Sequence, residues 1–271
     1  MKVLVVGSSG NLGSSLARKF GNDGFDVTCF TRQDWVANND YLFENIDVVV
    51  HAAANHSVLI SDNVGYYIDS NLGITGYVLD RLKLFKIKKL FFMSSCAVYG
   101  GLMCPKESDP MGPITLNGYM KAANEFLVGD FCSSHGIEYH ILRIFNLYGG
   151  VDRFSFVSKL LASIQNNLPL LVCNEGMSQR DYVHVDDVAN IISMLVRSQY
   201  CNIFLNIGTG FTTKISEIVK VAKECSPRLR VEYVSGPKEV EYIRADLCLL
   251  RTQIGVYHFK NVLEYVRSRL S

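Results

Sequence analysis

A glycine-rich segment near the amino terminus is the first stretch whose residue types could do chemistry. Gly7, Gly10 and Gly13 are spaced three apart in GSSGNLG, directly after a short apolar run. Glycines let a backbone approach a pyrophosphate, and a helix beginning there offers unpaired N–H groups and a partial positive charge. A glycine-rich turn without a ligand would have the same spacing, but the position between a strand and a helix favours a dinucleotide site. The residues predicted to bind it are Gly7, Ser9, Gly10, Asn11, Leu12 and Gly13.

The end of the second apolar run indicates which dinucleotide to expect. Sites for NAD place a carboxylate there, where it binds the ribose hydroxyls. This run ends at Thr31 and Arg32, and a guanidinium can pair with the 2′-phosphate of NADP. We therefore predict NADP, with NAD as the second choice, and Thr31 and Arg32 as cofactor-binding residues. Two alternatives stay open: Arg32 is a solvated loop residue, or Asp34 serves a ribose.

These residues need a scaffold, and the apolar patterning predicts one of alternating strands and helices. Expected strands cover residues 2–6, 25–31, 46–53, 89–94 and 138–144, and expected helices cover 11–20, 68–84 and 120–133. This alternation predicts an α/β fold with a Rossmann-like, doubly wound parallel sheet. From Gly149 on the elements shorten, with a helix expected over 154–165 and a strand over 170–172. We expect a dinucleotide-binding domain over 1–148, to which part of 180–208 returns, and a smaller C-terminal substrate-binding lobe over 149–271.

Composition narrows the classes of partner and compartment. The 271 residues include 27 basic and 26 acidic side chains and carry a net charge of +1, so neither nucleic acid nor an anionic membrane is expected as the main partner. Eight cysteines occur without a Cys-x-x-Cys pair, so neither a metal site nor a disulfide framework is predicted. Reduced cysteines, and the absence of a signal peptide or a long apolar run, indicate a cytoplasmic protein without a membrane span.

Several segments, in the expected order, resemble motifs of the extended short-chain dehydrogenase/reductase family, in its group of nucleotide-sugar epimerases, dehydratases and ketoreductases. Besides the glycine segment they are VHAAA (50–54), YYIDSNLGITG (66–76), MSSCAVYG (93–100), LRIFNLYG (142–149), RDYVHVDD (180–187) and NIGTG (206–210). The resemblance extends from residue 1 to about residue 250, and order over that length makes it specific. It implies further cofactor-binding residues, namely Ala52, Ala53, Ala54, Lys121 and Phe145.

The resemblance implies hydride transfer between a sugar carbon and a nicotinamide. In the family a serine and a tyrosine bind the reacting oxygen, while a lysine holds the ribose and lowers the pKa of the tyrosine, so that donors face the developing alkoxide. The serine stands four residues before the tyrosine of VYG, which is Ser95 here. The alternative for Ser95 is a strand-end serine that caps a turn.

The family's tyrosine is missing from its expected position. Its pattern reads Pro-x-x-x-Tyr-Gly-x-x-Lys-x-x-x-Glu, and this chain reads without a gap from Pro113 to Glu125 with Asn117 in the tyrosine's place and Lys121 as the lysine. Tyr119 fits only if a residue is inserted or deleted, and it would point about 200° away from Asn117 around a regular helix. The predicted catalytic set is therefore Ser95, Asn117 and Lys121, with Tyr119 as an alternative acid.

Asparagine donates a hydrogen bond but gives up no proton near neutral pH. Loss of a positioned general acid costs on the order of 10²–10⁴ in rate. Three explanations stay open: an engineered substitution that traps a ligand, an acid borrowed from elsewhere (Tyr119, a histidine or a water), or a fold that has lost catalysis.

The resemblance also implies a substrate site. Asn146 would reach the diphosphate of a nucleotide sugar, and Arg180 would pair with a phosphate; a salt bridge from Arg180 to Asp181 or Asp187 is the alternative. The family's second phosphate arginine is absent, and Lys238 is the candidate substitute. His184 and Asp186 are expected to fix a strand-to-helix turn, and His56 to be a loop residue.

These features predict a nucleotide-sugar 4-ketoreductase of deoxysugar biosynthesis, because a reductase consumes NADPH, with a nucleotide-diphosphate sugar as its partner. The alternatives are a 4-epimerase or a dehydratase, although Cys96 and Ala97 stand where dehydratases carry Asp-Glu. Asn117 favours a third possibility, a non-catalytic NADP-binding regulatory subunit. The resemblance further implies a homodimer.

Overall fold

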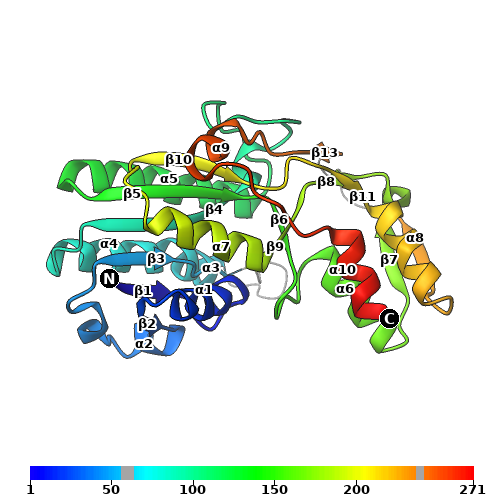
Figure 1. The fold of residues 1–271 in the computed structure, drawn as a ribbon, viewed down its shortest axis with the longest axis horizontal. Coiled ribbons are helices and arrows are strands. Elements are labelled where there is room, and N and C mark those ends of the chain that lie inside the picture. Colours follow the sequence, from blue (N-terminus) through cyan, green and yellow to red (C-terminus); the bar gives the residue numbers. More distant parts are fainter. Residues whose placement is uncertain (56–63, 236–240) are drawn as a thin grey trace.

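A parallel sheet forms the centre of the molecule (Figure 1). The computed structural model describes residues 1–55, 64–235 and 241–271. Within these ranges the main sheet has six strands in the order β10-β5-β4-β3-β1-β2, all paired in parallel. Their bounds are β1 (Lys2–Val6), β2 (Asp26–Phe30), β3 (Val48–His51), β4 (Lys89–Ser95), β5 (Glu138–Ile144) and β10 (Ile203–Ile207). The prediction of a Rossmann-like α/β fold is confirmed.

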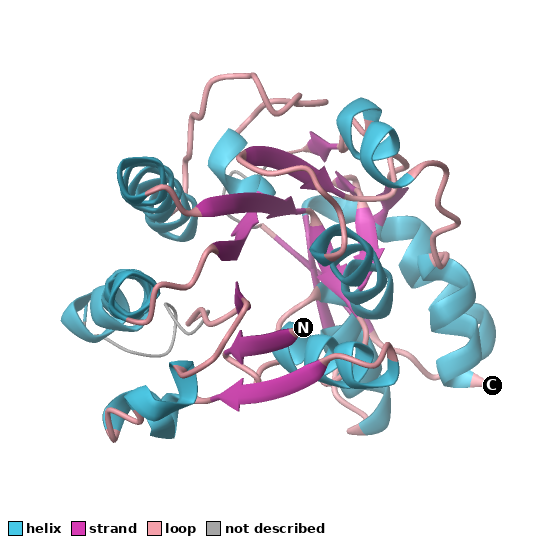
Figure 2. Cartoon of the chain, turned by 60° about the vertical axis from the view of Figure 1, so that its left-hand side comes forward, coloured by secondary structure: helices cyan, strands magenta, loops and turns pink. Residues whose placement is uncertain are grey.

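Helices cover both faces of this sheet, as Figure 2 shows. Val3 and Val5 of β1 belong to a core shared with α1 (Asn11–Asn22) and α7 (Val185–Val196), whereas Leu4 and Val6 face α4 (Ile74–Leu84) and α5 (Leu116–His135). Alternate side chains of the strand thus enter opposite cores. Burial on both faces explains why the strands read as continuous apolar runs.

The smaller lobe lies beyond the carboxyl ends of the sheet strands (Figure 1). A third core joins α6 (Phe156–Gln165), α8 (Ile215–Cys225) and α10 (Val262–Leu270) to β7 (Leu170–Cys173), which pairs with β12 (Val231–Val234). The remaining strands of this half are β6 (Asn146–Tyr148), β8 (Gln179–Arg180), β9 (Tyr182–His184), β11 (Thr213–Lys214) and β13 (Tyr242–Ile243). The division into domains at residue 148 stays a prediction.

Short helices lie in the connections between the longer elements. They are α2 (Arg32–Val36), η1 (Asp40–Phe43), α3 (Val64–Ile68), η3 (Asp69–Gly73), η4 (Cys96–Tyr99), η5 (Asn174–Gly176) and α9 (Cys248–Ile254). The helix expected over 68–84 is interrupted by η3, a turn of π-helix. No helix in the described ranges combines the length and apolarity needed to cross a membrane.

The expected helix over 120–133 begins earlier than predicted. Its first turn therefore includes Asn117 and Tyr119, two of the predicted catalytic residues. α5 begins at Leu116 because Thr115 caps it, its hydroxyl accepting a hydrogen bond from Gly118 N at 3.1 Å. Asn117 and Tyr119 therefore lie in regular helix, one turn and half a turn before Lys121. The first turn lacks an apolar repeat, so periodicity alone placed the boundary too late.

Candidate functional site

A cavity of about 200 Å³ lies at the carboxyl ends of β1, β2 and β3. The predicted cofactor-binding residues that line it are Gly7, Ser9, Gly10, Thr31, Arg32, Ala52, Ala53 and Ala54. Residues that the sequence reasoning missed also contribute, notably Trp35, Asn55 and Ser70. Trp35 is the chain's single tryptophan and follows β2 closely, which was the available signal. Segments far apart in sequence thus form one wall.

Two positions of the glycine segment, Gly7 and Gly13, have room only for glycine. Gly7 has φ +85°, and a Cβ there would lie 2.6 Å from the Ala53 backbone; a Cβ on Gly13 would lie 2.0 Å from Gly7 O. α1 begins with Gly10 as its N-cap, and no acidic side chain occupies its first turn. An anion can therefore approach the first N–H groups of α1, so the residues present fit a pyrophosphate.

Other predicted cofactor residues lie away from this cavity wall. Asn11 binds the start of the substrate lobe instead: its Nδ2 donates to Gly149 O at 3.1 Å, and its Oδ1 accepts from Val151 N at 2.8 Å. Leu12 packs against the core, and Phe145 is buried in it. These contacts join the glycine segment to the second half of the chain.

Asp34, which follows the second strand, is engaged by Thr31. The Asp34 carboxylate accepts hydrogen bonds from Thr31 N at 2.8 Å and Thr31 Oγ1 at 2.6 Å, and these bonds lower its pKa. Asp34 thus closes a capping box on α2, which leaves it less available to a ribose. The Arg32 guanidinium stacks 4.6 Å from the centre of the Tyr66 ring and donates to its hydroxyl.

The predicted catalytic residues gather where β4 meets α5. Ser95 ends β4, and its Oγ accepts a hydrogen bond from Ala97 N at 3.2 Å, so it caps the following turn. α5 packs tightly on this turn, since a Cβ on Gly118 would lie 2.6 Å from Ala97 O. The contact sets the neighbouring Asn117 beside the Ser95 turn.

Asn117 and Tyr119 have different surroundings. The Asn117 side chain is half-buried and makes no hydrogen bond to any of the residues that the structure describes. Tyr119 is 56% exposed and shares an outer stripe of α5 with Phe126 and Leu127, which are exposed too. Lys121, by contrast, is 6% exposed. Tyr119 therefore faces away from the buried lysine.

Lys121 lies in an apolar setting. Its Nζ donates to Met93 O at 2.7 Å and lies 5.1 Å from the centre of the Phe92 ring. Burial lowers the pKa of Lys121 to about 8, against the opposing charge of Glu125. A group with this pKa changes charge close to physiological pH.

Glu125, one turn after Lys121, is bound by other groups. Arg143 of β5 donates to both of its carboxylate oxygens, at 2.8 Å and 3.1 Å, and the Ser94 hydroxyl donates to it as well. Arg143 also donates to the Tyr99 hydroxyl at 2.8 Å. Both charges of the Glu125–Arg143 pair are almost fully buried. The sequence reasoning used Glu125 as a landmark and missed the pair.

The predicted substrate residues lie at the junction with the smaller lobe. Asn146 Nδ2 donates to Asp181 O at 3.0 Å, and the Arg180 guanidinium donates to Gln179 O at 3.1 Å. Burial raises the pKa of the Cys96 thiol to about 12, and the charge of Asp181 adds to this effect.

Asp181 and His184, close to Arg180 in sequence, have structural roles. The Asp181 carboxylate accepts hydrogen bonds from Thr209, Gly210 and Ala245. His184 accepts from Asp186 N at 3.1 Å, which confirms its predicted role at the start of α7. Lys238 and His56 lie outside the described residues.

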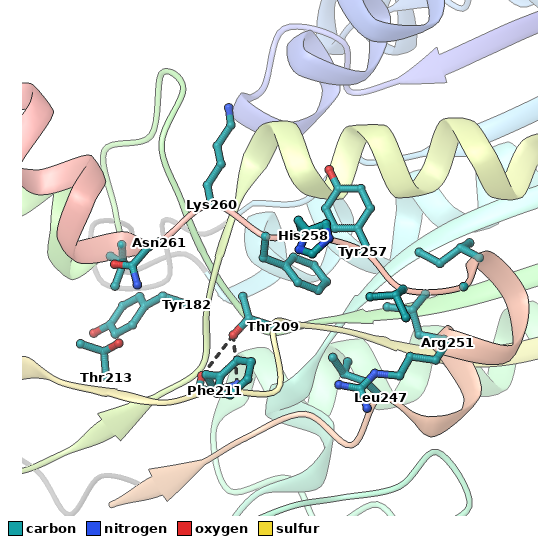
Figure 3. Close-up of a pocket in the computed structure, with 16 residues that line it drawn as sticks. Tyr182, Thr209, Phe211, Thr213, Leu247, Arg251, Tyr257, His258, Lys260 and Asn261 are labelled. Atoms are coloured by element: carbon teal, nitrogen blue, oxygen red, sulfur yellow. Dashed lines mark hydrogen bonds between the residues drawn. The ribbon is translucent and has the colours of Figure 1, made fainter.

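A larger cavity, of about 580 Å³, lies elsewhere (Figure 3). It is formed mainly by α9 and the segment leading to α10, which face Tyr182, Thr209 and Phe211. None of the predicted site residues lines it. Cavity size therefore does not identify the site, whereas the glycine segment does.

Comparison with known proteins now adds to this geometry. The model of the "NAD dependent epimerase/dehydratase family" matches residues 3–208. The chain belongs to this family. The resemblance to extended short-chain dehydrogenases/reductases that act on nucleotide sugars is thereby confirmed.

Individual members of the epimerase/dehydratase family extend the comparison over most of the chain. A putative UDP-glucose 4-epimerase of Methanocaldococcus jannaschii is 29% identical over 82% of this chain and 81% of its own length. A UDP-glucose 4-epimerase of Lactobacillus helveticus is 27% identical over 94% and 91%. The structure of a Bacillus cereus UDP-glucuronic acid 4-epimerase in complex with UDP-glucuronic acid and NAD covers 100% of this chain and 98% of that one, with TM-score 0.91 and 22% identity.

These relatives favour the alternative reaction over the first prediction. The two curated relatives are named as a putative and an assigned UDP-glucose 4-epimerase, not as 4-ketoreductases. The Bacillus cereus structure, at 22% identity, shows the likeness of fold and itself contains NAD. The chain is therefore an epimerase/dehydratase family protein, while the 4-ketoreductase and NADP predictions stay predictions.

Proposed function

We propose that this protein binds a nicotinamide dinucleotide and a nucleotide-diphosphate sugar across the carboxyl edge of the sheet, and acts as a sugar 4-epimerase. The observation that carries the proposal is the cavity wall formed by the glycine segment, Thr31, Arg32 and residues 52–54. Only glycine fits at Gly7 and Gly13, and the start of α1 is open to an anion. Named relatives with this activity support the choice of reaction.

The chain's own residues divide the work in this proposal. Gly7, Gly10 and the first turn of α1 hold the pyrophosphate, and Lys121 holds the ribose beside the nicotinamide. Ser95 and Asn117 donate hydrogen bonds to the reacting sugar oxygen. When bound, the dinucleotide supplies reversible hydride acceptance. Asn146 and Arg180 hold the diphosphate of the sugar nucleotide, as does Lys238.

A second candidate is an NADP-dependent 4-ketoreductase, and Arg32 favours it. Arg32 lines the cavity, and the nearby Asp34 carboxylate is occupied by the α2 capping box. A fork of donors there suits a 2′-phosphate better than two ribose hydroxyls. Dehydration is disfavoured, because Cys96 and Ala97 provide no carboxylic acid beside Ser95.

We further propose that the protein is a cytoplasmic homodimer. An exposed apolar stripe on α5 contains Leu116, Tyr119, Phe126 and Leu127 and suits a second copy of the chain. Sedimentation velocity of the native chain and of Phe126→Glu tests it. The dimer should dissociate in the variant, and a native monomer at micromolar concentration would refute the proposal.

The test of function restores the missing phenol. Asn117→Tyr should accelerate epimerisation of UDP-sugars by about 10²–10⁴, the range of one positioned general acid. Asn117→Tyr combined with Ser95→Ala is the matched control and should lose that gain. Oxidation of NADPH to NADP⁺ in the presence of 4-keto nucleotide sugars would favour the reductase. If the restored protein binds the dinucleotide but converts no sugar, it is a binding subunit rather than an enzyme.

A further inference from the structure

The side chains around Asn117 offer few groups that can exchange a proton near neutral pH. The Ser95 hydroxyl and the Asn117 amide retain their protons in this range. Burial raises the pKa of the Cys96 thiol to about 12. Tyr119 lies on the exposed stripe of α5. Among the residues that the structure describes here, Lys121 is the group that remains, one helical turn from Asn117 on the same side of α5.

No carboxylate in the described part of the chain forms a salt bridge with Lys121. Glu125 on the same helix is engaged by Arg143 of β5 and by Ser94. From β3 the facing group is His51, whose pKa burial lowers to about 3, so it is uncharged near neutral pH. The Lys121 amine is instead held by a neutral acceptor, the Met93 carbonyl, at 2.7 Å. Both the ammonium and the free amine are therefore compatible with this setting.

Asparagine is also shorter than the tyrosine that the family pattern has at this position. Its side chain ends several atoms short of the position of a tyrosine hydroxyl, and the half-buried Asn117 amide has no partner among the residues that the structure describes. A water bound to this amide would have a second polar partner in the sugar hydroxyl, and an ordered water requires at least two such partners.

We propose that Lys121 carries the proton in this chain, in place of a phenol, through a water bound to the Asn117 side chain. The inference rests on the proposed function. In the oxidative half-reaction the sugar C–H bond breaks and its hydride passes to the nicotinamide. The O–H bond breaks as well, and its proton passes through the water to the Lys121 amine, giving a ketone and an ammonium. In the reductive half-reaction the ammonium returns the proton as the hydride returns.

The location of the lysine supports this role. A solvated lysine would hold its proton far above neutral pH, whereas burial lowers the pKa of Lys121 to about 8. About a tenth of the amine is then uncharged at pH 7. Pairing of Glu125 with Arg143 keeps that carboxylate from stabilising the ammonium fully. Oxidation should speed up as pH rises through about 8, and reduction should slow down over the same interval.

The experiment compares Lys121→Arg in two backgrounds, the native chain and Asn117→Tyr. Arginine keeps a cation at the ribose but releases no proton in this range. Single-turnover hydride transfer is followed by nicotinamide absorbance from pH 6 to 10, and dinucleotide binding by calorimetry. In the native chain we expect a loss of about 10²–10⁴ in rate with binding retained, and a pH midpoint near 8 that disappears. In the Asn117→Tyr background the loss should be smaller, because the phenol carries the proton.

A pH midpoint unchanged by Lys121→Arg in the native chain would overturn the inference while leaving the proposed function intact. Failure of both backgrounds to transfer hydride with any UDP-sugar would refute the proposed function instead. NMR titration of ¹³C-lysine-labelled protein, with Lys121→Arg identifying the signal, needs no turnover. A Lys121 pKa above 10 in that titration would also overturn the inference.

Discussion

Replacing the buried Lys121 with methionine should change how the stability of the protein depends on pH. Methionine has a similar length and no charge, so Lys121→Met removes the titrating group with little change in packing. The hydrogen bond to Met93 O is lost at every pH. The informative quantity is therefore the difference between the native and variant free energies of unfolding, followed from pH 7 to 10.5.

The magnitude follows from the shift in pKa. Burial lowers the pKa of Lys121 from 10.5 to about 8 in the folded protein. Each unit is worth about 1.4 kcal/mol, so folding with a charged Lys121 costs about 3 kcal/mol at pH 7. Between pH 8 and 10.5 the unfolded chain binds more protons than the folded one, and the free energy of unfolding rises with pH. Below pH 8 the full cost is present, and above 10.5 it vanishes.

Urea unfolding measures the effect. The native chain should gain about 3 kcal/mol relative to Lys121→Met between pH 7 and 10.5. Titration of cysteines and tyrosines is common to both proteins and cancels in the difference. Lys83→Met on the exposed side of α4 is the control, and its difference should be flat. A flat difference for Lys121→Met would show that the amine is solvated, which contradicts its burial.

Three further predictions concern packing and cofactor choice. Glu125→Gln should lower the free energy of unfolding by about 3–5 kcal/mol in urea, because it leaves Arg143 buried without its counter-ion; a loss under 1 kcal/mol would mean that the pair is hydrated. Gly7→Ala should abolish dinucleotide binding in calorimetry, because its Cβ would lie 2.6 Å from the Ala53 backbone, and unaltered binding would remove the glycine segment from the site. Arg32→Asp should shift preference from NADPH to NADH by at least tenfold in Kd, and an unchanged ratio would show that Arg32 does not contact the 2′-phosphate.

The sheet and the glycine segment at its edge were predictable because their signals are local. A strand buried on both faces needs a continuous apolar run, and the run ending at Val6 forms β1, which pairs with β2 and β3. Gly7 was identifiable from the glycine spacing, and the structure shows why glycine is needed there: φ is positive and a Cβ would lie 2.6 Å from the Ala53 backbone. The alignment that places Asn117 in the tyrosine's position depended on matching residues between Pro113 and Glu125, within one helix and the segment before it.

Contacts between distant segments were not predictable in the same way. Glu125 and Arg143 meet only because α5 packs on β5, and neither flanking sequence reveals the other. The two hydrogen bonds between Asn11 and the segment after β6 span about half of the chain. The early start of α5 depended on Thr115 as a cap rather than on apolar spacing. Such features follow from the packing of whole elements.

Calorimetric titration of the native chain with NAD and NADP, before and after saturation with UDP-glucose, tests the central claim most directly. We expect one dinucleotide to bind per chain with micromolar affinity, and UDP-glucose to bind as a second, separate event. Gly7→Ala should eliminate both binding events. No heat of binding from either dinucleotide, in a chain whose circular dichroism shows it folded, would contradict the assignment of the cavity and with it the proposed reaction.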